Sequence, residues 1–373
     1  MIYLNNGYLH YTITPMGIKC LTQLLKDKAP SSIKQVNICE FTGKRFAIDT
    51  SIFVYRSLSN VRYQGDYLRN KEGKIVSHII GLFDKSVHYL SFGIQPIYVL
   101  DGKPPPEKWA CIQERNKKAQ ECKDQLDTAD ATGFMLASDK EKLEKGTIRI
   151  NKYHIQDLQT LFHLMGVSYI QSDSEAESYA GELCRMGYVD AVVSEDMDTL
   201  VYGCHTLIRK CLDRMEKRKE VVTTFPLSMA FEELQLTLSE FRDLCILCGC
   251  DYCTTIPKIG YQRAYQHIQT YKSIEGMIDS GKFEIPESFL NSYQGARDLF
   301  TMYMDKLPKE SIPIMSSTID YEKLQDYLVN ECGMSLKRVT TSLGKIKRAQ
   351  THLVQSPLSP KSPLANSPVL AST

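Results

Sequence analysis

The sequence predicts an α/β protein with a mostly parallel twisted sheet flanked by helices. Short apolar segments typical of strands lie at 44–48, 94–100 and 190–194. An acidic residue directly follows each of them, and a loop and a helical pattern come next. Strand, acid, loop and helix repeated in this order indicate a parallel sheet whose strands end at one edge. We therefore expect the acids to gather at that edge.

The composition is that of a soluble globular protein. The chain has 373 residues, of which 43% are hydrophobic and 24% charged, enough for two or three packed subdomains. Because the net charge is only +1, binding to nucleic acid would require basic residues segregated from acids. Twelve cysteines without a signal peptide indicate free thiols in a reducing compartment. No apolar run is long enough to span a membrane.

Two pairs of acids lie close together in the middle of the chain. One pair begins a helical run expected at 174–186, and the other follows the third expected strand. Acids two residues apart do not share a helix face, but they can straddle the end of an element. Either pair alone is typical of a solvated cap, whereas two pairs beside apolar segments favour a divalent-metal site. The acids are Glu175, Glu177, Asp196 and Asp198.

A helical insertion is expected between residues 103 and 153. It starts just after Asp101, the acid of the second strand, as Asp49 is the acid of the first. A charged run of this kind most often forms a solvated helix face. Here its position favours a place above the acids, where cations would neutralise the phosphates of a polyanion. The basic strip comprises Lys108, Arg115, Lys117 and Lys118.

Two further helices are expected within residues 241–268. The first is apolar and ends at Gly249, and the second starts just after Gly260, with Lys258 in the approach. Free backbone N–H groups at such a helix start suit an anion, for example a DNA phosphate. The cysteine run from Cys245 to Cys253 leaves zinc or iron–sulfur binding open, but its apolar helical stripe favours core thiols.

Six segments together resemble a known family. Their order and spacing are similar to those of the flap endonucleases of the XPG-type structure-specific nuclease family, from Met16 to the region of Ile278. The resemblance implies a helical arch over the active site and a C-terminal helix–two-turn–helix that binds DNA. The segments are MGIKCLTQLLKDKAPSSI, FAIDTSIFVY, YVLDGKPP, SEAESYAGELCRMG, VVSEDMDTLVYG and LCILCGCDYC.

The resemblance assigns metal binding to seven carboxylates of the chain. It implies two ions roughly 4 Å apart, one activating water and the other stabilising the leaving oxygen of a phosphodiester. Oxygen-only ligands indicate Mg²⁺, with Mn²⁺ as a substitute, rather than zinc. The metal ligands would be Asp49, Asp101, Glu175, Glu177, Asp196, Asp198 and Asp251.

The resemblance also gives roles to residues outside the acids. Lys108 and Arg115 would contact the scissile phosphate, and Tyr55 would stack on a base. The backbone of the duplex would be bound by Lys258, Gly260 and Arg263. A monovalent ion, K⁺, would be held by the carbonyls of Thr255, Ile256 and Ile259.

The chain departs from the family pattern at several points. Lys258 stands where the family usually has the first glycine of a Gly-Ile-Gly turn. The family normally begins at the Met-Gly-Ile found here at Met16, so residues 1–15 are an extension, or Met16 is the start. Residues 350–356 lack the paired aromatics of a clamp-binding box, which argues against docking to a sliding clamp.

The loop at 69–78 also differs. Family members that accept a one-nucleotide 3′ flap carry several acids there, whereas this chain has Lys71 and Lys74 beside Glu72. A solvent-facing loop, where such charges matter little, is the alternative. We expect weaker discrimination for a single 3′ nucleotide.

The sequence therefore predicts a Mg²⁺-dependent 5′ flap endonuclease with 5′–3′ exonuclease activity, acting in DNA replication and repair. The alternative within the family is a related 5′ exonuclease or junction-cleaving nuclease. A haloacid-dehalogenase-like phosphatase is disfavoured because Thr50 and Ser51 follow Asp49 in place of a second acid. A non-catalytic DNA-binding scaffold is disfavoured because no metal-site carboxylate is missing. We expect a monomer acting on branched DNA away from membranes, in the nucleus of a cellular eukaryote or otherwise in the cytoplasm or at a viral replication site.

The same reading divides the chain into six parts. They are an N-terminal extension (1–15), an N-terminal nuclease region (16–122), a helical arch and linker (123–158), an internal nuclease region (159–234), the helix–two-turn–helix with the C-terminal region (235–345), and a disordered Ser-Pro tail (346–373).

Overall fold

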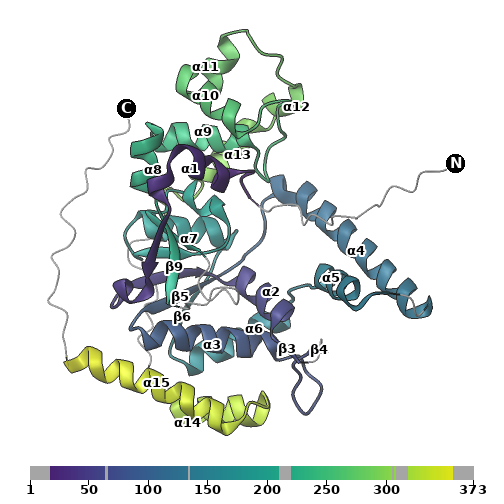
Figure 1. Cartoon of the computed structure of the whole chain (residues 1–373), viewed down its shortest axis with the longest axis vertical. Helices are drawn as coiled ribbons and strands as arrows, with labels where there is room; N and C mark the ends of the chain where they lie inside the picture. Colours follow the sequence, from purple (N-terminus) through teal and green to yellow (C-terminus); the bar gives the residue numbers. More distant parts are fainter. Residues whose placement is uncertain are drawn as a thin grey trace.

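The fold is built on a sheet of seven strands in the order β1-β9-β8-β7-β2-β5-β6 (Figure 1). The structure, a computed structural model, describes residues 17–63, 66–132, 135–209, 220–304, 306–307 and 318–355. The strands from β8 to β6 are parallel, and β9 is antiparallel to both of its neighbours. The predicted, mostly parallel sheet is therefore confirmed. Its strands are β1 (Lys34–Asn37), β2 (Arg45–Asp49), β5 (Gln95–Leu100), β6 (Ser168–Gln171), β7 (Ala191–Val193), β8 (Thr206–Arg209) and β9 (Val221–Pro226).

Helices cover both faces of this sheet, and short strands β3 (Arg62–Tyr63) and β4 (Asp66–Tyr67) form a separate pair. α2, α3 and α6 pack on one face, whereas α7 packs on the other. The helices are α1 (Leu21–Lys28), α2 (Thr50–Asn60), α3 (Ser77–Ser91), α4 (Trp109–Thr132), α5 (Ala137–Thr147), α6 (Lys152–Leu164), α7 (Ala176–Arg185), α8 (Leu227–Leu234), α9 (Leu238–Cys248), α10 (Tyr261–Tyr271), α11 (Ile274–Asp279), α12 (Glu287–Leu290), α13 (Tyr293–Thr301), α14 (Tyr321–Asp326) and α15 (Leu336–Gln355). Short turns of helix are η1 (Pro30–Ser32), η2 (Ile38–Phe41), η3 (Pro106–Lys108), η4 (Met197–Leu200) and η5 (Tyr327–Glu331).

The central strands are apolar on both sides because both of their faces are covered. Phe46 and Ile48 of β2 point into the core beneath α2 and α3, whereas Ala47 between them points into the core beneath α7. Continuous apolar runs of this kind are typical of buried parallel strands. β2 ends at Asp49, and α2 begins at the next residue, Thr50.

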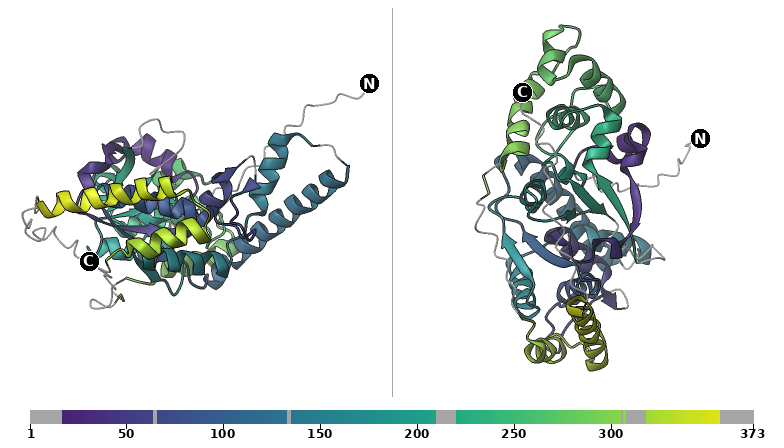
Figure 2. Two further views of the ribbon diagram at one scale, coloured as in Figure 1. Left: turned by 90° about the horizontal axis from the view of Figure 1, so that it is seen from below. Right: turned by 90° about the vertical axis from the view of Figure 1, so that its left-hand side faces the viewer.

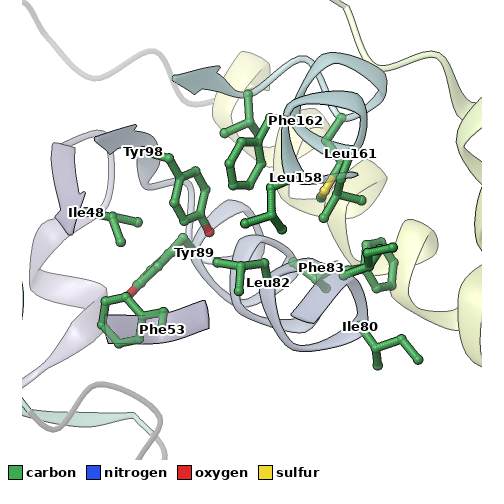
Figure 3. Close-up of a cluster of buried hydrophobic side chains, with 14 of the residues drawn as sticks. Ile48, Phe53, Ile80, Leu82, Phe83, Tyr89, Tyr98, Leu158, Leu161 and Phe162 are labelled. Carbon is green, nitrogen blue, oxygen red and sulfur yellow. The ribbon is translucent and has the colours of Figure 1, made fainter. Parts of the chain in front are cut away.

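The larger core is centred on α3, α6 and the strand β5 (Figure 3). Tyr98 and Phe162 stack with ring centroids 4.1 Å apart and an interplanar angle of 10°. The buried Tyr98 hydroxyl lies 2.7 Å from Ser86 Oγ, so its polar group has a partner. Removing a ring such as that of Phe162 typically costs about 3–5 kcal/mol. This core holds α3 and α6 against the sheet.

The predicted helical insertion forms an arch, defined here as α4 and α5. The two helices pack side by side and project from the body of the molecule (Figures 1 and 2). Two contacts hold the base of α5 against α2 and β3. Arg62 pairs with Glu144 at 2.8 Å, and the Tyr55 hydroxyl donates to the Lys145 carbonyl at 3.0 Å. These contacts therefore tie α5 to α2 and β3.

The C-terminal region contains two groups of helices. α9 and α10 follow each other around the turn that carries Asp251, and α11 to α13 pack near them. α14 and α15 return to the other end of the molecule, where α15 packs on α3 (Figure 1). None of the described helices is long and apolar enough to cross a membrane.

The tail boundary that the sequence predicts at residue 346 is wrong. α15 continues through Gln355, and Val339, Leu343 and Ile346 are buried on one side of it. The helix is stable because this apolar stripe packs against α3, while its basic residues remain in water. Residues 1–16 and 356–373, which include the predicted extension, Met16 and the Ser-Pro sites, lie outside the described residues.

Candidate active site

The predicted acids gather at the carboxyl edge of the sheet. β2 lies between β5 and β7, so the ends of these three strands are neighbours. Asp49 is the last residue of β2, Asp101 directly follows β5, and Asp196 comes shortly after β7. The expectation that strand-end acids share one edge is confirmed.

The N-terminus of α7 joins this edge through a capping contact. Glu175 is the N-cap of α7, and Glu177 lies in its first turn. Asp101 Oδ1 accepts a hydrogen bond of 2.7 Å from the Ala176 N–H. A carboxylate at a helix start is favoured by the free N–H groups and by the helix dipole. The cap therefore places the acids of α7 beside the acids of the strands.

Backbone and hydroxyl groups fix the acids that follow β7. Asp196 Oδ1 accepts from the Asp198 N–H at 3.1 Å, and Asp198 Oδ1 accepts from the Ile18 N–H at 2.6 Å. Ser194 Oγ donates to Asp49 Oδ2 at 2.9 Å and accepts from the Asp196 N–H at 3.0 Å. Ser194 thus links two strand ends, a role that its place at the end of an apolar run did not reveal.

Three of the acids meet closely enough to share a cation. Glu177, Asp196 and Asp198 each offer an oxygen, and these oxygens lie within 4.8 Å of one another. Within the described residues, the buried Glu177 Oε2 has no hydrogen-bond partner. An unpaired, buried carboxylate oxygen is costly unless a cation satisfies it. The oxygen-only donor set therefore fits a hard divalent ion.

Burial and mutual repulsion shift the titration of the cluster. Burial and the nearby Asp101 raise the pKa of Asp49 to about 7. Burial and Asp196 also raise the pKa values of Glu177 and Asp198. All these acids ionise together at neutral pH only when positive charge compensates them.

Two cations at the entrance of the arch, Lys108 of η3 and Arg115 of α4, provide part of that charge. Lys108 Nζ donates to Glu175 Oε1 and lies 3.9 Å from Asp251 Oδ2, and Arg115 Nη2 donates to the same Asp251 oxygen at 2.7 Å. Burial alone would lower the pKa of Lys108, but Glu177 and Glu175 outweigh it and the net shift is upward. Both cations therefore remain charged beside the acids. Tyr55 instead contacts α5, as described above.

Tyr252 is a site residue that the sequence reading missed. Its hydroxyl donates to Glu175 Oε2 and lies 3.0 Å from the Tyr202 hydroxyl. Tyr252 is buried, and Lys108 Nζ stands 5.8 Å from the centre of its ring. Its position directly after Asp251 could have indicated this role, but the sequence analysis considered only the cysteines around it.

Those cysteines lie in the core. Cys245, Cys248 and Cys250 are buried, and no metal-binding group of these thiols is found among the described residues. Burial raises the pKa of Cys248 and that of Cys250 to about 12. Since a metal binds the thiolate, such an environment favours the neutral core thiols that the helical stripe indicates.

The turn between α9 and α10 forms despite its unusual residue. Lys258 adopts a positive φ of 66°, the conformation for which glycine is best suited. Arg263 Nη1 donates to the Lys258 carbonyl at 2.9 Å, and the Ile259 N–H donates to the Ile256 carbonyl at 3.2 Å. Gly260 is the N-cap of α10. The lysine therefore keeps the turn that the glycine would make.

Comparison with known proteins identifies the family. The XPG N-terminal domain matches residues 16–122, and the XPG I-region matches residues 166–251. Flap endonuclease 1 of Glycine max is 38% identical over 347 residues, covering 92% of this chain and 90% of that protein. The chain belongs to the XPG-type flap endonuclease family. Flap endonuclease 1 of Ovis aries is 36% identical over 346 residues, with 92% and 90% covered.

Two solved structures have a similar fold. Flap endonuclease-1 from Methanococcus jannaschii is 26% identical with a TM-score of 0.63, covering 88% of this chain and 98% of that one. The catalytic core of Rad2 in complex with DNA substrate is 20% identical with a TM-score of 0.65, covering 88% and 100%. The family resemblance and the fold that the sequence motifs imply are confirmed.

Proposed function

We propose that this flap endonuclease family member is a divalent-metal-dependent nuclease that hydrolyses DNA phosphodiesters at flap–duplex junctions. The observation that carries the proposal is the acidic cluster at the sheet edge, with Lys108 and Arg115 inserted from the arch. Acids hold cations, and arch cations attract the phosphate that bare acids would repel. The activity would include 5′–3′ exonuclease cleavage and serve DNA replication and repair.

We propose two Mg²⁺ ions, replaceable by Mn²⁺, as the metal cofactor. The ligands would come from the cluster and its neighbours: Asp49, Asp101, Glu175, Glu177, Asp196, Asp198 and Asp251. When bound, the ions would supply a nucleophilic water at neutral pH and stabilise charge on the leaving oxygen. The raised pKa of Glu177 supports this proposal, since a cation would let the buried acid ionise.

The protein's own residues would bind and orient the DNA. Lys108 and Arg115 form ion pairs with Glu175 and Asp251, and part of their positive charge would stabilise the scissile phosphate. Tyr55, at the junction of α2 and α5, would stack on a base beside it. The start of α10 would hold the duplex backbone through Gly260 N–H, Lys258 and Arg263. K⁺ bound by the carbonyls of Thr255, Ile256 and Ile259 would stabilise that turn.

The partner would be branched DNA carrying a 5′ flap, bound by a monomer. Relatives of the chain in plants and mammals are flap endonucleases, which supports a nuclear site of action. We do not propose docking to a sliding clamp, because Gln350–Ser356 lacks paired aromatics. The other expected domain boundaries stay a proposal as well.

A cleavage assay tests the function. Purified protein is incubated with a 5′-labelled flap, a nicked duplex and a single strand, each with Mg²⁺ or EDTA. We expect Mg²⁺-dependent cutting of the flap at its junction. Asp196→Ala should reduce the rate by several orders of magnitude without abolishing DNA binding, whereas Asp279→Ala, an exposed acid of α11, should leave it unchanged. Equal cutting in EDTA or near-normal turnover by Asp196→Ala would contradict the proposal.

A further inference from the structure

The single tryptophan of the chain lies at the entrance of the arch. Trp109 is the first residue of α4 and directly follows Lys108, which binds Glu175. Half of its surface, 50%, is exposed. Among the residues that the structure describes, no aromatic ring stacks on it and no cation lies over it. A large, open aromatic face beside an active site is typical of a binding surface.

The helix α4 turns Trp109 away from Arg115. Lys108 of η3 and Arg115 of α4 both reach acids. Trp109 lies six residues before Arg115 in α4, which places the two side chains about 120° apart around the helix axis. Ile112, Gln113 and Asn116 share its side because they lie three, four and seven residues further on. We call Trp109, Ile112, Gln113 and Asn116 the uncharged stripe.

The chemistry of this pairing matches unpaired nucleotides. The cationic side suits phosphates, whereas the uncharged stripe offers an aromatic face, an apolar side chain and two amides. Gln113 and Asn116 are exposed. Proteins bind single strands by combining a cationic track with aromatic platforms on which bases stack. Bases inside a duplex expose no free face, so the stripe fits the flap strand better than the duplex.

We propose that Trp109 stacks on an unpaired base of the 5′ flap, close to the scissile phosphate held by Lys108 and Arg115. The inference rests on the proposed function and adds a base contact that draws the flap into the arch. Because every base has an aromatic face, the contact works on any sequence. It would act on nucleotides of the flap, so substrates without an unpaired 5′ nucleotide would not use it.

Tryptophan emission tests the contact directly. The protein is mixed in EDTA, so that DNA stays intact, with flap, nicked and blunt duplex substrates, and binding is followed separately by anisotropy of a label on the DNA. We expect the flap to quench Trp109 emission and the nicked duplex to quench it much less. Abasic nucleotides are then moved along the flap, and one or two adjacent positions should restore the emission.

Variants test the contribution to cleavage. Trp109→Ala should lower kcat/KM on flaps by about five- to a hundredfold, the usual effect of losing one stacked base. Trp109→Phe should recover most of the loss, and cutting at a nick should change little in either variant. Tyr153→Ala removes another exposed aromatic side chain, 60% exposed on α6, and should leave both substrates unaffected. Thermal unfolding of each variant checks its fold.

The outcomes separate the two proposals. If anisotropy shows flap binding while Trp109 emission is unchanged, or equally quenched by every abasic flap, the stacking contact is wrong. If no flap binding is found at all, the proposed function fails first. If Trp109→Ala cuts flaps and nicks with equal losses, the residue supports the arch and not the flap strand.

Discussion

The Tyr252 hydroxyl donates a hydrogen bond to Glu175 Oε2 while Lys108 Nζ donates to Oε1 of the same carboxylate. Both oxygens of Glu175 are therefore held by side chains from other parts of the chain. The Tyr202 hydroxyl lies 3.0 Å from the Tyr252 hydroxyl and gives it a second polar partner. This arrangement fixes the orientation of an acid at the start of α7.

Tyr252→Phe should slow cleavage by about ten- to a hundredfold, because hydrogen bonds to charged groups contribute about 1.5–3 kcal/mol. We expect lower kcat and a higher half-saturating Mg²⁺ concentration, since Glu175 would lose its orientation. Tyr202→Phe keeps the bond to Glu175 and should have a smaller effect. Titration of activity with Mg²⁺ measures both. An unchanged kcat and metal dependence in Tyr252→Phe would contradict this role.

Gly17→Ala should abolish most activity without unfolding the protein. A Cβ at Gly17 would lie 2.1 Å from Asp196 Oδ1 and 2.4 Å from Asp198 Oδ1, so the acids would have to move. Gly73 has the same φ of 82° but no atom within 4 Å of its Cβ position. Gly73→Ala therefore measures the backbone strain alone, about 1 kcal/mol. Cleavage rates and urea unfolding are compared. Equal activity of the two variants would show that Gly17 is not a packing constraint.

The arch cations should act on rate more than on affinity. We expect Lys108→Ala and Arg115→Ala to lower kcat by about 10²-fold or more, because they stabilise charge in the transition state. Lys117→Ala, which removes an exposed lysine of α4, is the control and should mainly weaken binding at low salt. Single-turnover rates and DNA affinity separate the effects. A raised KM with normal kcat for both variants would make them general phosphate contacts.

The predicted and observed sites agree where the signal is local. Asp49 and Asp101 could be placed because each directly follows an apolar strand, and parallel strands end together. Tyr252 could not, because its partner Glu175 is 77 residues away in sequence. The fold alone brings α7 and the turn after α9 together. Aromatic hydroxyls give no periodic pattern that would reveal such a contact.

Two other features depend on contacts that a sequence pattern does not show. The tail boundary was wrong because the apolar stripe of α15 lies among basic residues, and the stripe is informative only when α3 is known to pack beside it. Lys258 takes the positive φ that suits glycine, and hydrogen bonds made by Arg263 and Ile259 close the turn around it. Such bonds offset a local backbone preference of about 1 kcal/mol.

Acid should destabilise the fold through a histidine remote from the acidic cluster. Burial and the neighbouring His78 lower the pKa of His154 to about 4, from an ordinary value of 6.5. Between these values the unfolded chain binds more protons than the folded one, so stability rises with pH in that window and is fully present above it. His154→Gln should flatten this part of the curve. Urea unfolding from pH 4 to 7 measures it, with His163→Gln, an exposed histidine of α6, as control. Parallel curves for His154→Gln and the wild type would refute the assignment.

The loop between β4 and α3 contains a lysine with an ion pair, Lys74, and an exposed lysine, Lys71. Lys74 Nζ pairs with Asp157 Oδ1 at 2.5 Å, and Asn70 Nδ2 anchors the loop to the Glu331 carbonyl at 2.9 Å. Lys71 is exposed and has no ion pair among the described residues. The loop therefore presents its cation at a fixed place, next to Glu72.

Lys71 should make the protein tolerant of longer 3′ flaps. An acid at this place would repel a phosphate backbone that continues past the junction, whereas a lysine attracts it, and the attraction falls with salt. We expect similar cleavage rates on double flaps with 3′ overhangs of zero, one and several nucleotides at low salt. Lys71→Glu should slow cleavage of the longest overhang most, whereas Lys74→Gln should have less effect because Asp157 already neutralises Lys74. Rates are measured for each overhang at two salt concentrations. A sharp optimum at one nucleotide in the wild-type protein would show that Lys71 does not help to bind a longer 3′ flap.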